Sequence, residues 1–500
     1  MAITFLGIEL GSTRIKSVLV DQYHKIIATG SYAWENSLEN GFWTYNLNQA
    51  MEGLTASFKN LKENTTIDHI KSIKAIGISG MMHGYLPFDK DGHQLAGFRT
   101  WRNTTAQEAA DILSNNLTIK IPRRWSIAHF YQAIIDKEPH VKQVAFITTL
   151  AGYIHWQLTG QQVLGVGDAS GMFPVYGDDY DPKYVSRFNN IWGQDIKKIL
   201  PQVRLAGEEA GTLTLKGARL LDPDGALKPG ITLCPPEGDA ATGMVATNSV
   251  SAGTGNISAG TSIFAMIVLE RNLSRMYNQL DLVATPDGKA VAMVHCNNGC
   301  SDMDGYINLF HQNLQAFGVD VDKNTLYETL YKQALEGDPD CGGVLSYNFL
   351  SAEPMAGVKE GRPMLLRKPN ANFTLPNVMR SLVFSTIASL KLGMKVLEKE
   401  NVKLREINGH GGFFKTPGVA QSILATALGV PITVMAQAGE GGAWGAAVLA
   451  AFAYIKEETL DNYLGKIFAK EKSTKIEPGD SDGFDRYLEE FEDNLGLMDV

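Results

Sequence analysis

The sequence contains few cysteines and no long apolar run, and each of these absences excludes a class of protein. It has four cysteines in 500 residues. Cys296 and Cys300 lie close together, but no second Cys or His pair has the spacing of a zinc site, so we expect buried, reduced thiols. No apolar segment approaches the roughly 18 residues of a membrane span, and the N-terminus does not resemble a signal peptide. A cytoplasmic protein without a membrane partner is predicted.

Positive charge is also scarce, because 45 Lys and Arg residues face 54 Asp and Glu residues, giving a net charge of -9. This balance argues against a nucleic-acid partner, although a local cationic pocket for a nucleotide remains compatible with it. The hydrophobic content of 44% and charged content of 20% are typical of globular proteins. A chain of this length is expected to form about two or three domains.

The stretch Phe5–Asp21 combines two apolar strands with a short polar turn. Gly11 allows the backbone to turn tightly, and Ser12 and Thr13 supply hydroxyl and N–H groups. Lys16 adds a cation just beyond the turn. Such a turn has suitable chemistry for holding a phosphate between two strands.

Glu9 lies on the strand that enters this turn, where its carboxylate is suitably placed for Mg²⁺ and its water shell. The alternative interpretation is a plain β-hairpin with a polar tip, because short Gly-Ser-Thr turns are common in hairpins. The stretch alone does not separate these two interpretations.

The same pattern returns near the middle of the chain, in Ser258–Val268. Gly260, Thr261 and Ser262 correspond to the first turn, and an apolar strand follows them. Two such turns at the heads of two halves indicate a duplicated, two-lobed enzyme. The Gly/Ser/Thr-rich residues 248–255 mark the boundary, giving domains 1–250 and 251–500.

Further elements follow from hydrophobic periodicity and from glycine and proline signals. Thr416 is expected to cap a helix with Pro417 at its first position. The small residues of Gly439–Ala451 are expected to let a flat ligand approach the backbone. We predict strands over 25–32, 73–79, 231–234 and 432–435, and helices over 47–59, 105–114, 376–399 and 439–451.

Together these motifs resemble the FGGY carbohydrate kinases, sugar kinases of the actin/hexokinase/Hsp70-like ATPase fold. The resemblance extends from Leu6 to about Ala451. Within the family the chain is most similar to the pentulose kinases (xylulokinase and ribulokinase), because Met82-His83-Gly84 is similar to a xylulokinase sugar-site motif. It implies an α/β, two-domain actin-like ATPase (ribonuclease H-like) fold with the active site in the interdomain cleft.

The resemblance also implies roles for individual residues. Asp239, in Glu-Gly-Asp, falls on the catalytic base and is expected to reach the sugar and the metal, whereas Glu9 falls on the metal-bridging carboxylate. The adenosine segments include Gly411, Gly412 and the 439–442 loop. The implied ATP and phosphate contacts are Gly11, Ser12, Thr13, Lys16, Gly260, Thr261, Ser262, Gly411, Gly412, Gly441 and Gly442, and the implied sugar contacts are Met82, His83, Trp101, Asn103, Asp168 and Asp239.

Each candidate also has a structural interpretation. Asp239 precedes a helix and is a good N-cap residue. His83 is compatible with a hydrogen-bonded structural histidine, Trp101 with a core position, and Asp168 with an Asx turn in Gly-Asp-Ala-Ser-Gly. Lys16 is compatible with a solvated side chain.

The sequence departs from the family pattern at three positions. Glu9 replaces the usual Asp, Met81 replaces a frequent Gln, and Asn103 replaces a frequent Asp. The last two lie in the sugar region, so D-xylulose and L-ribulose both remain candidate substrates.

The predicted reaction is Mg²⁺-dependent transfer of the ATP γ-phosphate to the terminal primary hydroxyl of a ketopentose. The alternatives are a nucleotide-binding switch of the same fold, or a kinase for another polyol or sugar acid such as gluconate. A dinucleotide oxidoreductase is rejected, because no strand–GxGxxG–helix unit is present. A homodimer is expected only by analogy with similar kinases.

Overall fold

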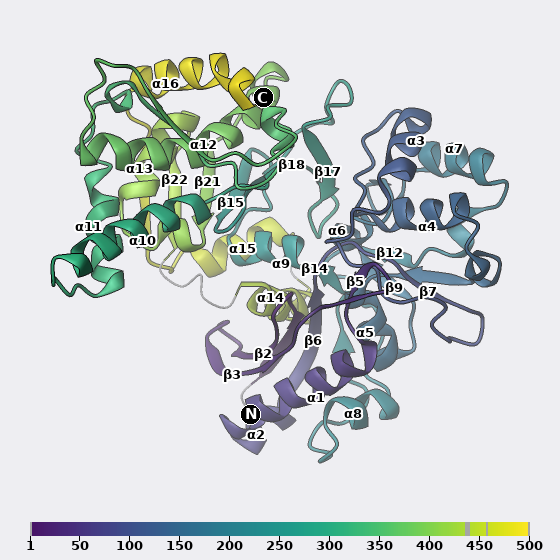
Figure 1. The fold of residues 1–500 in the computed structure, drawn as a ribbon. Coiled ribbons are helices and arrows are strands. Elements are labelled where there is room, and N and C mark those ends of the chain that lie inside the picture. The colour runs from purple at the N-terminus through teal and green to yellow at the C-terminus, as the bar shows by residue number, and fades with distance from the viewer. Residues whose placement is uncertain (1–2, 436–440, 457–458, 499–500) are drawn as a thin grey trace. The chain divides into compact units, whose positions relative to one another are not determined.

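The computed structural model describes residues 3–435, 441–456 and 459–498, which form two compact units (Figure 1). The first unit contains residues 1–250 together with 281–291 and 437–470. The second contains residues 251–280, 292–436 and 471–500. The first unit therefore takes two later segments in addition to the predicted stretch 1–250, and each unit is described by itself below.

A six-stranded mixed sheet forms the centre of the first unit, in the order β13-β6-β1-β2-β3 with β14 also paired to β6. The first three strands form an antiparallel meander. Strand β6 runs parallel to β1, and β13 and β14 both run parallel to β6. The strands are β1 (Thr4–Leu10), β2 (Arg14–Asp21), β3 (Ile26–Ala33), β6 (Ile73–Gly80), β13 (Thr232–Leu233) and β14 (Glu237–Gly238).

Helices surround this sheet and carry several of the candidate residues. The helices of the first unit are α1 (Leu47–Glu63), α2 (Ile67–Lys71), α3 (Gln107–Leu117), α4 (Ser126–Ile135), α5 (Leu150–Thr159), α6 (Val166–Ala169), α7 (Pro182–Trp192), α8 (Leu215–Leu221), α9 (Asp239–Ala246), α14 (Gly441–Ile455) and α15 (Leu460–Phe468). Its short paired strands include β4 (Ser37–Glu39), β5 (Phe42–Thr44), β7 (Leu86–Phe88), β8 (Phe146–Thr148), β9 (Val163–Gly165), β10 (Val175–Tyr176), β11 (Asp179–Tyr180) and β12 (Gln202–Arg204).

The sheet of the second unit repeats the strand order of the first. Within this unit the order is β18-β16-β15-β21-β22-β23, in which β15 pairs antiparallel with β16 and parallel with β21. The strands β3-β2-β1-β6-β13 thus correspond to β18-β16-β15-β21-β22. This correspondence supports the predicted duplication. The strands are β15 (Thr254–Ala259), β16 (Ile263–Val268), β18 (Ala290–Cys296), β21 (Glu406–His410), β22 (Ile432–Met435) and β23 (Ser473–Ile476), whereas β17 (Leu280–Ala284) falls almost wholly within the residues of the first unit.

The remaining elements of the second unit are mostly helical. Its helices are α10 (Ser301–Ala316), α11 (Lys323–Gln333), α12 (Leu375–Lys399), α13 (Val419–Leu428) and α16 (Asp482–Asp493), and β19 (Val344–Tyr347) pairs with β20 (Met364–Arg367). The longest helix, α12, is buried along much of its length.

Two helices cover opposite faces of the first sheet. The space beside Gly30 of β3 is filled by α1, and the spaces beside Gly7 and Gly77 are filled by the backbone of α14. Gly7 pairs with Val18, and Val18 pairs with Thr29, so these three residues face the same side of the sheet. Gly30 follows Thr29 in β3 and therefore faces the other side. In Figure 1, α14 accordingly lies against β2 and β6, although it is formed by the C-terminal part of the chain.

The small residues of α14 allow this close packing. A Cβ atom on Gly7 would lie 1.9 Å from the carbonyl oxygen of Ala443, and one on Gly77 would lie 2.0 Å from that of Ala446. A Cβ atom on Gly445 of α14 would likewise lie 2.2 Å from the carbonyl oxygen of Thr242 in α9. Helix and strands can approach this closely only where side chains are missing.

Most predicted elements are confirmed within a few residues, including the strand 432–435 and the helices beginning near 47 and 376. The predicted cap at Thr416 is wrong. The helix begins at Val419, after Gly418 in a left-handed conformation, and no side chain caps it. Two residues, Pro417 and Gly418, therefore lie between Thr416 and the first residue of the helix.

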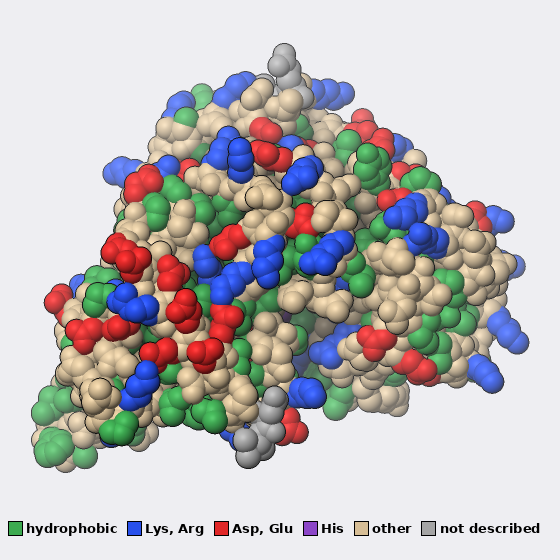
Figure 2. Space-filling model, turned by 90° about the horizontal axis from the view of Figure 1, so that it is seen from above, with side chains coloured by type: hydrophobic (Ala, Val, Ile, Leu, Met, Phe, Trp, Pro, Cys, Tyr) green, Lys and Arg blue, Asp and Glu red, His purple; other side chains and the backbone are tan. Residues whose placement is uncertain are grey.

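The four cysteines are buried and free of disulfide bonds, as predicted. No helix within the described ranges is long and apolar enough to cross a bilayer. On the face shown in Figure 2, acidic, basic and hydrophobic side chains are intermixed.

We predict that Gly77→Ala destabilises the first unit by about 3 kcal/mol or more, because its Cβ would overlap a helix backbone that cannot move aside cheaply. Thermal and urea unfolding measure this change. Gly465→Ala in α15 is the matched control, since no atom lies within 4 Å of its added Cβ. Equal stability of the two variants would contradict the proposed packing of α14.

Candidate functional site

The first predicted phosphate turn is a β-hairpin connection between β1 and β2, as expected from the sequence. The Gly11 N–H donates to the Arg14 carbonyl at 3.0 Å, which closes the turn. Ser12 is half-buried, and Thr13 is exposed at the tip. Lys16 stands directly opposite Glu9 in the register of the two strands, so the cation and the carboxylate occupy neighbouring positions.

Glu9, the penultimate residue of β1, is half-buried and lies beside the first turn of α14. A Cβ atom on Gly442 would lie 2.5 Å from Glu9 Oε1 and 3.1 Å from the Thr242 hydroxyl. Ser79 donates to or accepts from the same Thr242 hydroxyl at 2.8 Å. The groups that converge here carry oxygen donors, the ligand type that Mg²⁺ prefers, so the residues present fit such an ion.

Of the predicted glycine-rich adenosine segments, the 439–442 loop falls partly outside the described residues, because 436–440 are not described. Gly441 and Gly442 form the first turn of α14 and belong to the first unit. This position places Gly442 beside Glu9.

The second phosphate turn and the Gly411–Gly412 loop lie side by side in the second unit. Gly411 follows β21 and has a φ of +102°. A Cβ atom on Gly411 would lie 2.4 Å from the carbonyl oxygen of Ala259. The turn that contains Gly260, Thr261 and Ser262 is closed by a Gly260 N–H bond to the Ser262 carbonyl at 2.9 Å. The structure thus joins these two predicted segments.

Asp239 is brought to the predicted sugar motif, from which it is separated by 157 residues in the sequence. Its Oδ1 accepts the Met82 N–H at 3.2 Å and the Ala240 N–H at 2.9 Å. It is the first residue of α9, and the N-cap is Gly238, which rules out the capping interpretation. Burial raises the pKa of Asp239, and the two N–H donors oppose that rise. A raised pKa makes a carboxylate a stronger base.

His83 uses both ring nitrogens within the first unit. The Arg124 Nε donates to Nε2 at 3.0 Å, which leaves Nδ1 as the protonated nitrogen, and Nδ1–H donates to the Gly171 carbonyl at 3.1 Å. Arg124 also pairs with the buried carboxylate of Asp281. His83 has a φ of 70°, so its backbone adopts a strained conformation that these contacts hold in place.

Trp101 and Asn103 differ in exposure. Trp101 is 43% exposed, which excludes a core position. Asn103 is buried, its Oδ1 accepting the Trp43 N–H and its Nδ2 donating to the Trp43 carbonyl, both at 2.8 Å. The Asn103 side chain therefore binds the backbone of β5.

Asp168 lies fully buried in α6, and its Oδ2 accepts the Thr149 hydroxyl at 2.6 Å. Its Oδ1 has no hydrogen-bond partner within the described residues and lies 3.3 Å from the position of a Cβ on Gly238. Burial raises the pKa of Asp168 to about 7, with the Thr149 hydroxyl opposing and the charge of Asp239 adding to the rise.

A third buried carboxyl, Glu237, was not predicted from the sequence. It accepts the N–H groups of Gly167 at 3.3 Å and Asp168 at 2.8 Å, and so connects α6 to the strand that precedes Asp239. Burial, followed by the charge of Asp168, raises its pKa well above the usual value. The only sequence signal was a Glu two residues before the predicted base, in an otherwise apolar stretch.

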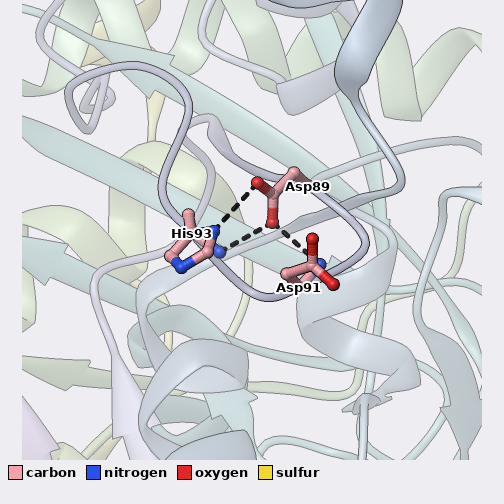
Figure 3. Close-up of side chains that lie close together, drawn as sticks. All are labelled: Asp89, Asp91 and His93. Carbon is pink, nitrogen blue, oxygen red and sulfur yellow. Dashed lines mark hydrogen bonds and ion pairs between the residues drawn. The ribbon is translucent and has the colours of Figure 1, made fainter.

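A separate group of metal-ligand types, Asp89, Asp91 and His93, lies on the turn after β7 (Figure 3). Asp89 Oδ1 accepts the N–H groups of Asp91 and His93, each at 2.9 Å, and Asp89 Oδ2 contacts His93 Nδ1 at 3.1 Å. These bonds are those of an Asx turn and account for the cluster without a ligand.

Comparison with known proteins agrees with this geometry. The FGGY family of carbohydrate kinases matches in both parts, its N-terminal domain over residues 4–225 and its C-terminal domain over residues 255–454. Xylulose kinase of Haemophilus influenzae is 24% identical over 476 residues, which cover 87% of this chain and 91% of that protein.

Solved structures of carbohydrate kinases share the fold. Xylulose kinase from Rhodospirillum rubrum has a TM-score of 0.81 at 16% identity, with 99% of each chain covered. Gluconate kinase from Lactobacillus acidophilus has a TM-score of 0.80 at 17% identity, covering 100% of this chain and 99% of that one. The predicted fold class, an α/β two-domain actin-like ATPase, is confirmed.

We predict that Gly442→Ala lowers kcat/KM about 10²-fold, because the added methyl group would displace the Glu9 carboxylate by about an ångström. Glu9→Asp in the same chain shortens the side chain by one methylene and should restore most of the activity. Gly305→Ala, in open space on α10, is the control. A double variant as impaired as Gly442→Ala alone would show that the methyl group acts elsewhere.

A second prediction concerns the pH dependence of stability. Because the folded-state pKa of Asp168 is raised to about 7, its protonated form stabilises the fold at low pH, and this contribution is lost as pH rises from about 4 through 7. Asp168→Asn stays neutral and should gain at most a few kcal/mol over the wild type at pH 8. Thermal unfolding at pH 5 and pH 8 measures the difference. Exposed Asp91→Asn is the control, and an equal Asp168→Asn effect at both pH values would contradict the prediction.

Proposed function

Because the chain belongs to the FGGY family of carbohydrate kinases, we propose that it transfers the γ-phosphoryl group of ATP to the terminal primary hydroxyl of a ketopentose, D-xylulose or L-ribulose. The product is then the pentulose 5-phosphate. The observation that carries the proposal is the hydrogen bond from the Met82 N–H to the Asp239 carboxylate. This bond holds Asp239, the proposed base, next to the Met82–Gly84 segment that resembles a xylulokinase sugar site.

In the proposed mechanism Asp239 accepts the proton of the sugar hydroxyl while the hydroxyl oxygen attacks the γ-phosphorus and ADP leaves. Its raised pKa and the two N–H donors that fix its Oδ1 suit this role. Bound Mg²⁺ would neutralise phosphate charge, and Glu9 and Asp239 are the carboxylates that would hold it.

The phosphate groups of ATP are proposed to contact both hairpin turns. Gly11, Ser12, Thr13 and Lys16 come from the first unit, with Gly441 and Gly442 nearby in α14. Gly411 and Gly412 follow β21 in the second unit, beside the turn that contains Gly260–Ser262. Backbone N–H groups and hydroxyls of such turns stabilise the equatorial oxygens of a transferred phosphoryl group.

The sugar is proposed to lie against Met82, His83 and Trp101, next to Asp239. Trp101 offers an exposed aromatic face, which suits the apolar face of a sugar. The chain is 24% identical to a xylulose kinase, which supports the ketopentose over other sugars.

A gluconate-type substrate is the second candidate, because the fold is shared with a gluconate kinase. A nucleotide-binding switch is the third candidate, and it would need no base next to Met82.

We predict that Mg-ATP turnover rises strongly with one ketopentose among D-xylulose, L-ribulose, D-ribulose and L-xylulose, with gluconate and glycerol as comparison substrates. Asp239→Asn should lower kcat about 10²- to 10⁴-fold while Mg-ATP still binds, because the amide removes the proton acceptor but leaves Glu9 to hold the metal and the turns to hold the phosphates. Coupled ADP release and calorimetry measure the two effects. Asp181→Asn, at the N-terminus of α7, is the matched control. If no sugar raises ADP release above background, the kinase assignment for these substrates is wrong.

A further inference from the structure

The carbonyl groups of the first phosphate turn are held by two buried aromatic residues outside the turn. Trp34 Nε1 donates to the Gly11 carbonyl at 2.7 Å, and the Tyr45 hydroxyl donates to the Ser12 carbonyl at 2.6 Å. The Trp34 N–H donates to the Thr13 carbonyl at 3.2 Å. The two rings are each 2% exposed and pack with centroids 4.4 Å apart. Three consecutive carbonyls are therefore bonded to one aromatic pair.

This arrangement determines which groups of the turn remain for a ligand. With its carbonyls bonded to the aromatic pair, the turn cannot rotate a carbonyl oxygen toward a phosphate without breaking a buried hydrogen bond. Ser12 and Thr13 donate no hydrogen bond to any residue that the structure describes. Their hydroxyl and N–H groups are the donors that an anion requires.

The aromatic pair is in turn connected to the two residues that follow Trp101. Asn103 binds both the N–H and the carbonyl of Trp43, two residues before Tyr45. Arg102 stacks on the Trp43 ring at 4.0 Å and donates to the Asn36 side chain at 2.9 Å, and Asn36 donates to the Tyr45 hydroxyl at 3.3 Å. Two routes of direct contact thus lead from residues 102–103 to the phosphate turn.

We propose that Trp34 and Tyr45 are positioning residues for the first phosphate turn, and that Asn103 acts on the same turn through Trp43. The inference rests on the proposed function, because the phosphate contact of this turn is itself proposed. It assigns Asn103 to the support of the ATP site, in place of the sugar contact expected from the sequence. Hydrogen bonds linked in this way strengthen one another in a buried environment.

Tyr45→Phe and Trp34→Phe test the proposal, because each keeps an aromatic ring and removes one hydrogen-bond donor. Each should weaken Mg-ATP binding about tenfold in calorimetry without sugar, as expected when a buried carbonyl loses its partner. In turnover assays the KM for ATP should rise by a similar factor, while the KM for the sugar stays within about twofold.

Tyr32→Phe on β3 is the matched control, because the Tyr32 hydroxyl makes no hydrogen bond within the described residues. It should leave ATP binding unchanged. Unchanged ATP affinity in both test variants would overturn the proposal. An equal rise in the KM values for ATP and sugar would also overturn it, since that indicates a general loss of structure. Tyr45→Phe is the conservative variant if Trp34→Phe folds poorly.

Asn103→Ala separates the two roles of this residue. A change confined to ATP affinity supports the connection through Trp43, whereas a change confined to sugar affinity overturns that part and restores the sugar contact. The calorimetric measurement needs no turnover. If the Tyr45 variant binds ATP more weakly but no sugar is phosphorylated, the proposed function fails and the positioning role of Tyr45 stands.

Discussion

The close contact between α14 and the strands β1 and β6 is the constraint on which the first unit depends. At Gly7 and Gly77 a helix backbone lies where side chains would otherwise be, so neither strand tolerates a Cβ atom there. The same contact places Gly442 against the Glu9 carboxylate and Gly445 against α9, the helix that begins with Asp239. One packing requirement thereby brings Glu9 and the helix that begins with Asp239 to the same helix, α14.

The buried carboxyl groups beside Asp239 lower the stability of the fold when they are charged. Asp168 and Glu237 are both buried, and burial raises the pKa of each. Two such groups beside Asp239 destabilise the fold at neutral pH unless they bind protons or donors, and only Glu237 receives two backbone N–H groups. Perturbed carboxyls of this kind cluster at functional sites more often than elsewhere, which agrees with a kinase active site.

The outcome for individual residues shows where sequence reasoning reached its limit. The hairpin at Gly11–Thr13, its repeat at Gly260–Ser262 and the start of a helix at Asp239 followed from local turn chemistry. Asn103 lies in the predicted region, but its side chain is bonded to β5, because a buried amide binds whichever backbone groups lie nearest. The packing role of the small residues in α14 was not predicted for a similar reason, since the backbone they meet belongs to strands and a helix far away in the sequence.

The sequence by itself determined the duplicated hairpins, most of the helices and strands, and the membership of a kinase family. These properties are encoded in short patterns, such as apolar periodicity, glycine at turns and motifs in a set order. Only the tertiary structure decided that α14 belongs to the first unit, that Glu237 clamps α6, and that Trp34 and Tyr45 hold the phosphate turn. Each of these contacts joins residues far apart in the chain, and no local pattern specifies which distant backbone group a side chain will meet.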